Sequence, residues 1–219
     1  MKTFKIAILL LFPILLGSCA SKYQAVGPSN LNYNSQHVEQ GISLEYKYDL
    51  LKKKYAKKEK KKDVRLVAVR IKNNSNEDVT FGEDIFLTYK NGGKVLLMPT
   101  EEVFSKLKQH PTSHLAYLLL SPVSVYTTKT HANGLTETSN AFPIGLIVGP
   151  GLAAGNLIAA SSANKKFKRD LREYDLHGKK IERGATVYGL VGIRANNYDA
   201  LELRFESPAV PPHGETTTP

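Results

Sequence analysis

Short stretches in which apolar and polar residues alternate predict β-strands along much of the chain. Leu44, Tyr46 and Tyr48 alternate with polar residues, a period of two that leaves one face of a strand in water. Similar or β-branched runs occupy residues 64–71, 79–81, 85–89, 94–98, 186–193 and 200–205. The triplet 91–93, Asn-Gly-Gly, separates two of these runs and predicts a hairpin, because its tight turn requires positive φ. Seven short strands predict a mainly β fold, an antiparallel sandwich over residues 41–205.

A segment of different character, residues 100–176, interrupts the strands. Thr100 and two following acids predict the start of a helix that continues through Leu107. The apolar run 114–122 ends at Pro122, which should kink or stop a helix. A polar loop is expected over 127–140, and a long helix over 152–174. The sequence therefore predicts an apolar α-helical hairpin inserted into the sandwich, which makes the fold α+β overall.

The strand segments together resemble immunoglobulin-like domains of secreted bacterial proteins. The resemblance lies in the hydrophobic pattern of LVAVRIKNNS, FLTYKNGGKV, ERGATVYGLVGI and LELRF, about half of the chain that follows residue 18. It implies a sandwich with an immunoglobulin-like topology. That fold carries many adhesion, binding and accessory roles, so it does not specify a function.

The N-terminus carries the signals of export and lipid attachment. Residues 1–18 combine two early lysines with a short apolar run, which predicts a secretory signal peptide because the run is too short to span a bilayer. Leu16-Gly17-Ser18-Cys19 follows, and Cys19 is the only cysteine in 219 residues. This motif resembles the lipobox of bacterial lipoproteins. The resemblance implies that Cys19 becomes the acylated N-terminus of a Gram-negative envelope protein. The alternative is an incidental cysteine in an ordinary signal peptide.

The residues next to the anchor point to a location. Ala20 and Ser21 replace the acidic residue that retains lipoproteins at the inner membrane, so the resemblance favours the outer membrane, facing the periplasm. Residues 19–40 are polar and predict a flexible tether between lipid and domain. Residues 206–219 are rich in Pro and Thr and predict a disordered tail.

Small residues recur every four positions in the inserted segment. Gly151, Gly155, Ala159 and Ala163 form one series, and Gly145 and Gly149 form a shorter one. This spacing lets a second helix approach closely, and residues 115–120 are the natural partner. Residues 138–164 carry no charge, so three interpretations remain: a hairpin packed on the sandwich or on another subunit, a membrane-inserted hairpin, or a nucleotide site. The glycines and prolines argue against a simple spanning helix.

Known chemical motifs give little support to catalysis. Residues 149–154 match the GxGxxA dinucleotide fingerprint, but no second strand follows the helix as a βαβ unit requires. His110 and His114 have a metal-ligand spacing, but Pro111 lies between them and no third ligand is near. We therefore predict no enzyme activity, no cofactor and no metal.

Charge is concentrated in two blocks. The chain has 30 Lys and Arg against 20 Asp and Glu, a formal charge of +10. The two blocks are candidate contacts for an anionic surface, and their basic residues are Lys52, Lys53, Lys54, Lys57, Lys58, Lys60, Lys61, Lys62, Lys165, Lys166, Lys168 and Arg169. The plain interpretation is a solvated, edge-protecting connector; the functional one is contact with phosphates of envelope lipids. Lysine dominance and the export signal argue against nucleic acid.

Together these features predict a lipid-anchored, non-catalytic binding or assembly module. Its partners are the membrane lipid at the anchor and either an envelope membrane protein, the membrane surface or further copies of the chain. The alternative is a structural lipoprotein that oligomerises through a membrane-inserted hairpin, and a more distant one is an enzyme of unknown type.

Overall fold

The structure is a computed structural model that describes residues 19–206, so the predicted signal peptide and nearly all of the predicted tail lie outside the described residues. The chain forms two compact units. Unit 1 contains residues 19–25, Lys52–Lys57 and Leu107–Asp170. Unit 2 contains Val26–Leu51, Lys58–Lys106 and residues 171–206. Each unit is therefore assembled from segments that are distant in the sequence.

Unit 2 is built around a five-stranded antiparallel sheet. Its strand order is β1(Ser35–Glu39), β2(Ile42–Lys47), β3(Val64–Asn73), β10(Thr186–Arg194) and β6(Leu97–Met98). The central pair, β3 and β10, matches nine residue positions from Thr186↔Lys72 to Arg194↔Val64. In β2 buried and partly exposed residues alternate, as the period of two predicts, whereas β3 is buried on both faces over most of its length.

A second layer closes the core of unit 2. It consists of the strand pairs β11(Leu201–Phe205) with β5(Ile85–Tyr89) and β4(Val79–Thr80) with β9(Lys180–Ile181). Side chains from both layers form one cluster in which Ile42, Phe81, Ile85, Val191 and Ile193 are fully buried. Of the described residues, 31% lie in strands and 33% in helices, so the fold class is α+β rather than mainly β. The immunoglobulin-like topology stays a prediction.

Of the local predictions in unit 2, the turn at residues 91–93 is confirmed and the end of the tether is wrong. Gly92 of the predicted hairpin turn has φ of +84°, and Val95 N–H donates to the Leu87 carbonyl across it. The predicted tether is wrong at its end, because residues 35–39 form β1 and pair with β2. Short 3-10 helix η1(Pro28–Asn30) also lies in the predicted tether. The polar sequence concealed β1 because this edge strand alternates half-buried and exposed residues.

The first lysine block folds as a helix, α2(Lys53–Lys62), a secondary structure for which the sequence analysis made no prediction. One side of α2 is buried through Tyr55, which is 1% exposed, and Glu59, which is 6% exposed. Apart from Ala56, lysines occupy the remaining positions, as an amphipathic surface helix requires. The predicted helix after Thr100 is α3(Thr100–Leu107), with Glu101 and Glu102 in its first turn.

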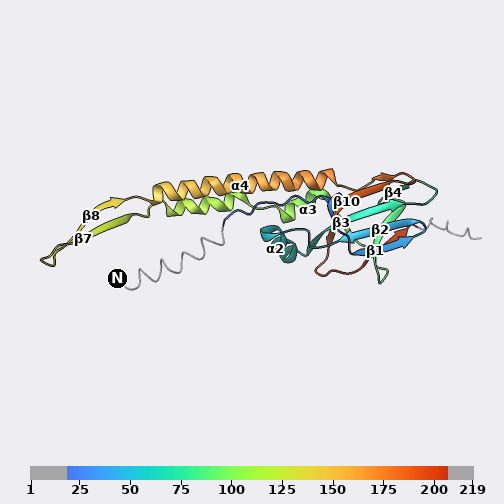
Figure 1. The fold of residues 1–219 in the computed structure, drawn as a ribbon, viewed down its shortest axis with the longest axis horizontal. Helices are drawn as coiled ribbons and strands as arrows, with labels where there is room; N and C mark the ends of the chain where they lie inside the picture. The colour runs from blue at the N-terminus through green and yellow to red at the C-terminus, as the bar shows by residue number, and fades with distance from the viewer. Residues whose placement is uncertain (1–18, 207–219) are drawn as a thin grey trace, which may run out of the picture. The chain divides into compact units, whose positions relative to one another are not determined.

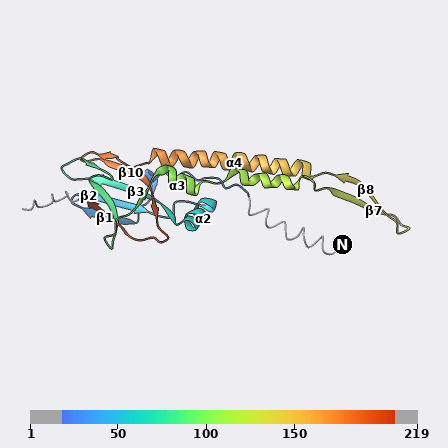
Figure 2. The same cartoon turned by 180° about the vertical axis from the view of Figure 1, so that it is seen from behind.

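Unit 1 contains a long hairpin-like segment that we call the arm, residues 111–160. It comprises the 3-10 helix η2(Pro111–Leu120), the strands β7(Val125–Thr130) and β8(Thr136–Phe142), and the first part of α4(Gly145–Glu173). Both ribbon views show η2 beside α4, with β7 and β8 beyond them (Figure 1, Figure 2). The predicted polar loop 127–140 is thus wrong, since it forms an antiparallel hairpin with a register shift after Tyr126. Helix α4 starts seven residues before the predicted position and includes Pro150.

Buried Glu59 makes the stability of unit 2 depend on pH. Burial raises the pKa of the Glu59 carboxyl to about 7. Two interactions partly oppose this rise: the hydrogen bond that Leu66 N–H donates to the carboxylate at 2.8 Å, and the charge of Arg65. The folded carboxyl thus keeps its proton at a pH at which the unfolded one has lost it. Stability contributed by this group is complete below pH 4.5 and declines as the pH rises through about 7.

We expect Glu59→Gln to remove this decline. At pH 8 the variant should exceed the wild type in unfolding free energy by ~2–3 kcal/mol, because a neutral amide avoids burying a charge. Chemical denaturation at pH 5 and pH 8 measures the difference, and exposed Glu83→Gln is the control. An equal pH dependence in wild type and Glu59→Gln would contradict the assignment.

Candidate functional site

Two glycines permit close contact between α4 and η2 in the arm. A Cβ atom at Gly145 would clash with the carbonyl oxygen of Leu120, and one at Gly149 would lie 2.9 Å from the Tyr117 carbonyl oxygen. Gly145 N–H also donates to the Val123 carbonyl at 2.9 Å. The run expected to be the partner of the small residues therefore lies beside this pair.

The longer series of small residues divides between two faces. Gly151 and Gly155 are exposed, and a Cβ at either position meets no atom within 4 Å. Ala159 is half-buried and Ala163 is 4% exposed. The structure thus brings Gly145, Gly149 and Ala163 into internal packing and leaves Gly151 and Gly155 on the surface.

The arm exposes most of the large apolar side chains on the described surface. Seventeen such residues are exposed among residues 19–206, and fourteen belong to the arm. Those fourteen are Leu115, Leu118, Leu119, Val123, Val125, Tyr126, Leu135, Phe142, Ile144, Leu146, Ile147, Val148, Leu152 and Ile158. Exposed apolar patches of this kind mark contact with a membrane or with another macromolecule.

The apolar surface extends around α4 rather than along one side. Leu146, Ile147 and Val148 are 60%, 66% and 39% exposed, and consecutive helical residues point about 100° apart. Leu118 and Leu119 of η2 add exposed apolar area of their own. A helix that is apolar on all sides is typical of a core or a membrane span and not of a surface helix.

Length and composition also make α4 long and apolar enough to cross a membrane, the one such helix among the described residues. Within its most apolar window only 22% is buried by the rest of the chain. Residues 109–128 and 138–164, which form the two sides of the arm, contain no Lys, Arg, Asp or Glu. The charge-free character noted in the sequence for one side therefore applies to both.

The residues after Cys19 are fixed to unit 1. Ala20 N–H donates to Asn156 Oδ1 at 2.6 Å. Ser21 N–H donates to Gln109 Oε1 at 2.9 Å, and Gln109 Nε2 donates back to the Ser21 carbonyl at 2.6 Å. The predicted flexible tether is thus also wrong at its beginning. Exposed Cys19 is held beside α4 at the level of Asn156.

An aromatic and amide cluster joins three separate segments of unit 1. The rings of Tyr23, Tyr55 and Phe167 contact one another with centroids 5.0–5.3 Å apart. Asn164 Oδ1 accepts hydrogen bonds from the Tyr55 hydroxyl at 3.0 Å and from Gln109 N–H at 2.9 Å. Asn164 Nδ2 donates to the Gln109 carbonyl at 2.9 Å. No single run of sequence signals this cluster, because its members are up to 144 residues apart.

Basic residues from both blocks belong to unit 1. The basic cluster of unit 1, as we call it, comprises Lys22, Lys52, Lys53, Lys54, Lys57, Lys165, Lys166, Lys168 and Arg169. With Lys108 and Lys129, unit 1 has eleven basic residues against two acids in residues 19–25, 52–57 and 107–170, a net charge of +9. Residues 26–51, 58–106 and 171–219 hold seventeen basic and eighteen acidic residues, a net charge of −1. The positive charge is therefore a property of unit 1.

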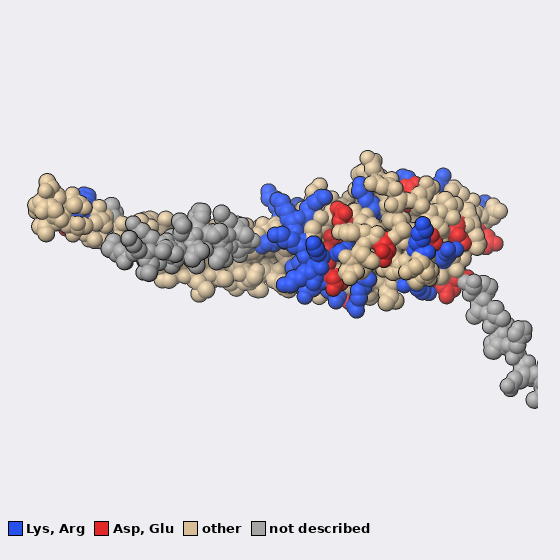
Figure 3. Space-filling model, turned by 90° about the horizontal axis from the view of Figure 1, so that it is seen from below, with Lys and Arg blue, Asp and Glu red and all other residues tan. Residues whose placement is uncertain are grey.

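The visible surface reflects this distribution. Basic side chains gather in a band, whereas the visible part of the arm is almost free of charge (Figure 3). Burial lowers the pKa of Lys54, which also lies within electrostatic range of Cys19 and Lys57. The remaining lysines of the first block, Lys58, Lys60, Lys61 and Lys62, belong to unit 2.

The other sequence candidates fall in structural positions. His114 is 2% exposed and stacks on Tyr117, and burial lowers its pKa with a contribution from Lys54. Among the described residues no group of three His, Cys, Asp or Glu side chains is placed to hold a metal ion. Gly149 and Gly151 lie inside α4 and not in a loop between strand and helix, where the dinucleotide fingerprint requires them.

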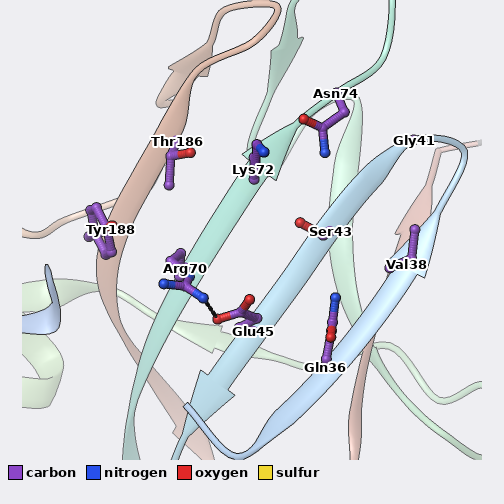
Figure 4. A pocket seen from close by; sticks show the side chains of 10 residues that line it. All are labelled: Gln36, Val38, Gly41, Ser43, Glu45, Arg70, Lys72, Asn74, Thr186 and Tyr188. Atoms are coloured by element: carbon purple, nitrogen blue, oxygen red, sulfur yellow. Dashed lines mark ion pairs between the residues drawn. The ribbon is translucent and has the colours of Figure 1, made fainter. Parts of the chain in front are cut away.

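A concavity of about 580 Å³ lies on the outer face of the five-stranded sheet in unit 2 (Figure 4). Arg70 is central to it and pairs with Glu45, and its guanidinium lies 5.3 Å from the centre of the Tyr33 ring. The residues that line the concavity come from four adjacent strands and from the turn positions Gly41 and Asn74, and they are mostly polar, as expected for the water-facing side of an antiparallel sheet. Sequence reasoning did not single out any of them.

Comparison with protein-family models, with curated proteins and with solved structures gives no match for this chain. The features that bear on function are therefore the geometry of the arm, the position of Cys19 and the basic cluster.

The two pairs of glycines predict opposite effects of the same substitution. Gly145→Ala and Gly149→Ala should destabilise the arm by ~1–3 kcal/mol, because a methyl group forces η2 away from α4. Gly151→Ala and Gly155→Ala should stabilise it by about 0.5–1 kcal/mol, because alanine restricts the unfolded chain and meets open space. Hydrogen exchange of the arm amides measures both. Equal effects of the two pairs would contradict the packing described here.

Proposed function

We propose that this protein is a lipid-anchored envelope lipoprotein that acts as a non-catalytic binding or assembly module, with its arm docked in the lipid layer of the membrane. Acylated Cys19 would be the anchor, on the periplasmic side of the outer membrane. Unit 2, proposed to be an immunoglobulin-like sandwich, would remain in the aqueous phase. The observation that carries the proposal is the apolar surface around the whole of the arm.

The distribution of exposed apolar groups favours insertion over lateral contact with a surface. A helix that lies flat on a membrane has one apolar and one polar face. The arm has exposed Leu146, Ile147 and Val148 in three directions, so a flat orientation would leave apolar side chains in water. Enclosure by acyl chains satisfies all directions at once.

The length of the apolar section agrees with a bilayer. Exposed apolar residues run from Ile144, immediately before α4, to Ile158 within it, which corresponds to about 21 Å at the helical rise. The first positions of the β7–β8 hairpin, where Val125 pairs with Phe142, extend this by a few ångströms. The total approaches the ~30 Å of a hydrocarbon core. Tyr126 and Phe142 then mark one end of the section, a position at which aromatic side chains favour the membrane interface.

The other end of the apolar section coincides with the anchor and the positive charge. Ala20 is bound to Asn156, so acyl chains on Cys19 would leave the protein where the apolar surface ends. Lys165, Lys166, Lys168 and Arg169 follow about two to four turns further along α4. Lysines at this position attract anionic headgroups.

Substitution of exposed apolar residues tests the proposal. Using the chain with Cys19→Ala and without signal peptide, we expect flotation with phosphatidylcholine vesicles. Leu146→Ser with Ile147→Ser should reduce the bound fraction at least tenfold, because two largely exposed side chains lose their transfer free energy.

The matched control replaces Val38 and Leu96 of unit 2, which are 58% and 73% exposed, by serine and should bind as the parent does. If the parent chain stays entirely soluble in the presence of vesicles, insertion of the arm is wrong. A protein partner that captures the arm from solubilised envelopes under those conditions would replace it.

Self-assembly in the membrane is the second candidate function. Gly151 and Gly155 are four residues apart on the exposed face and leave room for a second helix. The β7–β8 sheet has only two strands, so each strand has one edge without a β partner among the described residues. Copies of the arm can therefore pair through helices or strand edges.

We expect Gly155→Leu to reduce chemical crosslinking of membrane-bound protein at least fivefold if the helices meet at this face, because the leucine separates them. Ala154→Leu, also exposed on α4 but directed elsewhere, serves as the control. Unchanged crosslinking in Gly155→Leu would exclude this helix face as the contact.

A further inference from the structure

A small cavity of about 270 Å³ lies in unit 1 beside the N-terminal segment. Six residues line it: Lys22, Tyr23, Ala159, Ser162, Ala163 and Lys166. Four belong to adjoining turns of α4, and two come from the segment that hydrogen bonds fix to α4 and Gln109. The lining thus combines the small side chains of two alanines with two exposed lysines, one from each segment.

The charges at this cavity have no compensation within the described part of the chain. No carboxylate there forms an ion pair with Lys22 or Lys166. Residues 19–25, 52–57 and 107–170, which form unit 1, contain only two acids. Glu137 lies near the end of the β7–β8 hairpin, and Asp170 pairs with Arg169 at 3.5 Å. An anion that enters the cavity thus meets a positive field, and the nearest carboxylate along α4, Asp170, lies one turn beyond Lys166 and pairs with Arg169.

We propose that this cavity binds the phosphate group of an anionic phospholipid. Lys22 and Lys166 would contact the phosphate from opposite sides, Ser162 would offer a hydroxyl group, and the methyl groups of Ala159 and Ala163 would contact the glycerol and the first acyl carbons. This inference rests on the proposed membrane-bound function and names the lipid that the arm would hold.

The position of the cavity agrees with the depth of a headgroup. Ser162 and Lys166 follow Ile158, the last exposed large apolar residue of α4, by one and two turns. Lys22 is three residues from Cys19, whose acyl chains would enter the same leaflet. A phosphate at this level has its acyl chains directed along the apolar section of α4.

The small side chains form the volume of the site. Ala159 and Ala163 are four residues apart and face the segment that carries Lys22 and Tyr23. Larger residues at these positions would fill the cavity. The two series of small residues thus serve different purposes in the proposed arrangement: close helix packing at Gly149 in the shorter series and a lipid site at Ala163 in the longer one.

The experiment uses the full acylated chain in a neutral detergent, titrated separately with dihexanoyl-phosphatidylglycerol, dihexanoyl-phosphatidylcholine and inorganic phosphate. Nuclear magnetic resonance of the Ala159 and Ala163 methyl groups reports occupancy of the cavity. We expect saturable shifts with phosphatidylglycerol, and an affinity at least tenfold lower in Lys22→Gln with Lys166→Gln. Lys53→Gln with Lys165→Gln removes the same charge from the basic cluster outside the cavity and should change the affinity less than threefold.

Each other outcome overturns the site. Equal losses in the two double variants would mean diffuse attraction by the basic cluster and no specific cavity. Saturation by inorganic phosphate as tight as that by phosphatidylglycerol would assign the cavity to a free anion and not to a lipid. Equal binding of phosphatidylcholine would remove the role of net negative charge. Vesicle flotation of Lys22→Gln with Lys166→Gln, in the Cys19→Ala background, shows separately whether the arm still docks, so failure of the site and failure of the proposed function are distinguishable.

Discussion

The arrangement of unit 1 depends on one buried side chain, the amide of Asn164. It satisfies the main chain at Gln109 from both its oxygen and its nitrogen, and it also accepts the Tyr55 hydroxyl group. Removal of this amide would leave several buried polar groups without partners, which costs more than any one hydrogen bond contributes. Through Gln109 and the aromatic cluster, the same residue fixes the segment after Cys19. The segment after Cys19, the first lysine block at Tyr55 and α4 therefore meet at a single polar centre.

Apolar exposure imposes the second constraint. A soluble domain would bury Leu146 and Ile147, yet unit 1 uses the buried side of α4 for glycines that contact η2. Because the backbones of α4 and η2 pack closely, the pair is thin, and little side-chain volume is available to cover its outer surface. The proposed environment in lipid follows from this geometry: small residues inside and large ones outside reverse the usual pattern of a soluble hairpin.

The sequence allowed prediction of the elements whose periodicity is strong and local. β2, β3, β5, β10, β11 and α3 lie where alternation or capping residues place them, and Gly92 adopts the positive φ expected of its turn. Errors arose where tertiary contacts override composition. The polar segment 19–40 includes β1 and forms hydrogen bonds at Ala20 and Ser21. The predicted loop 127–140 is a threonine-rich hairpin, and no apolar pattern in the sequence indicates its pairing. Of the candidate site, Cys19, the glycines and the lysines could be named in advance. Their grouping could not, because the contacts of Tyr55 and Asn164 join residues more than a hundred positions apart.

The hydrogen bond between Ala20 and Asn156 leaves Cys19, the proposed anchor, almost no freedom to move away from α4. The single residue between Cys19 and this bond spans less than 4 Å, whereas a fully extended tether of the predicted 22 residues would span some 70 Å. A lipoprotein on a long tether can search the space above a membrane for partners. If Cys19 is acylated as proposed, a protein held this closely is confined to the membrane plane, where encounters are two-dimensional. Under the same proposal, any carrier that moves the protein across the periplasm would have to cover the arm together with the acyl chains, because Ala20 holds Cys19 beside the arm.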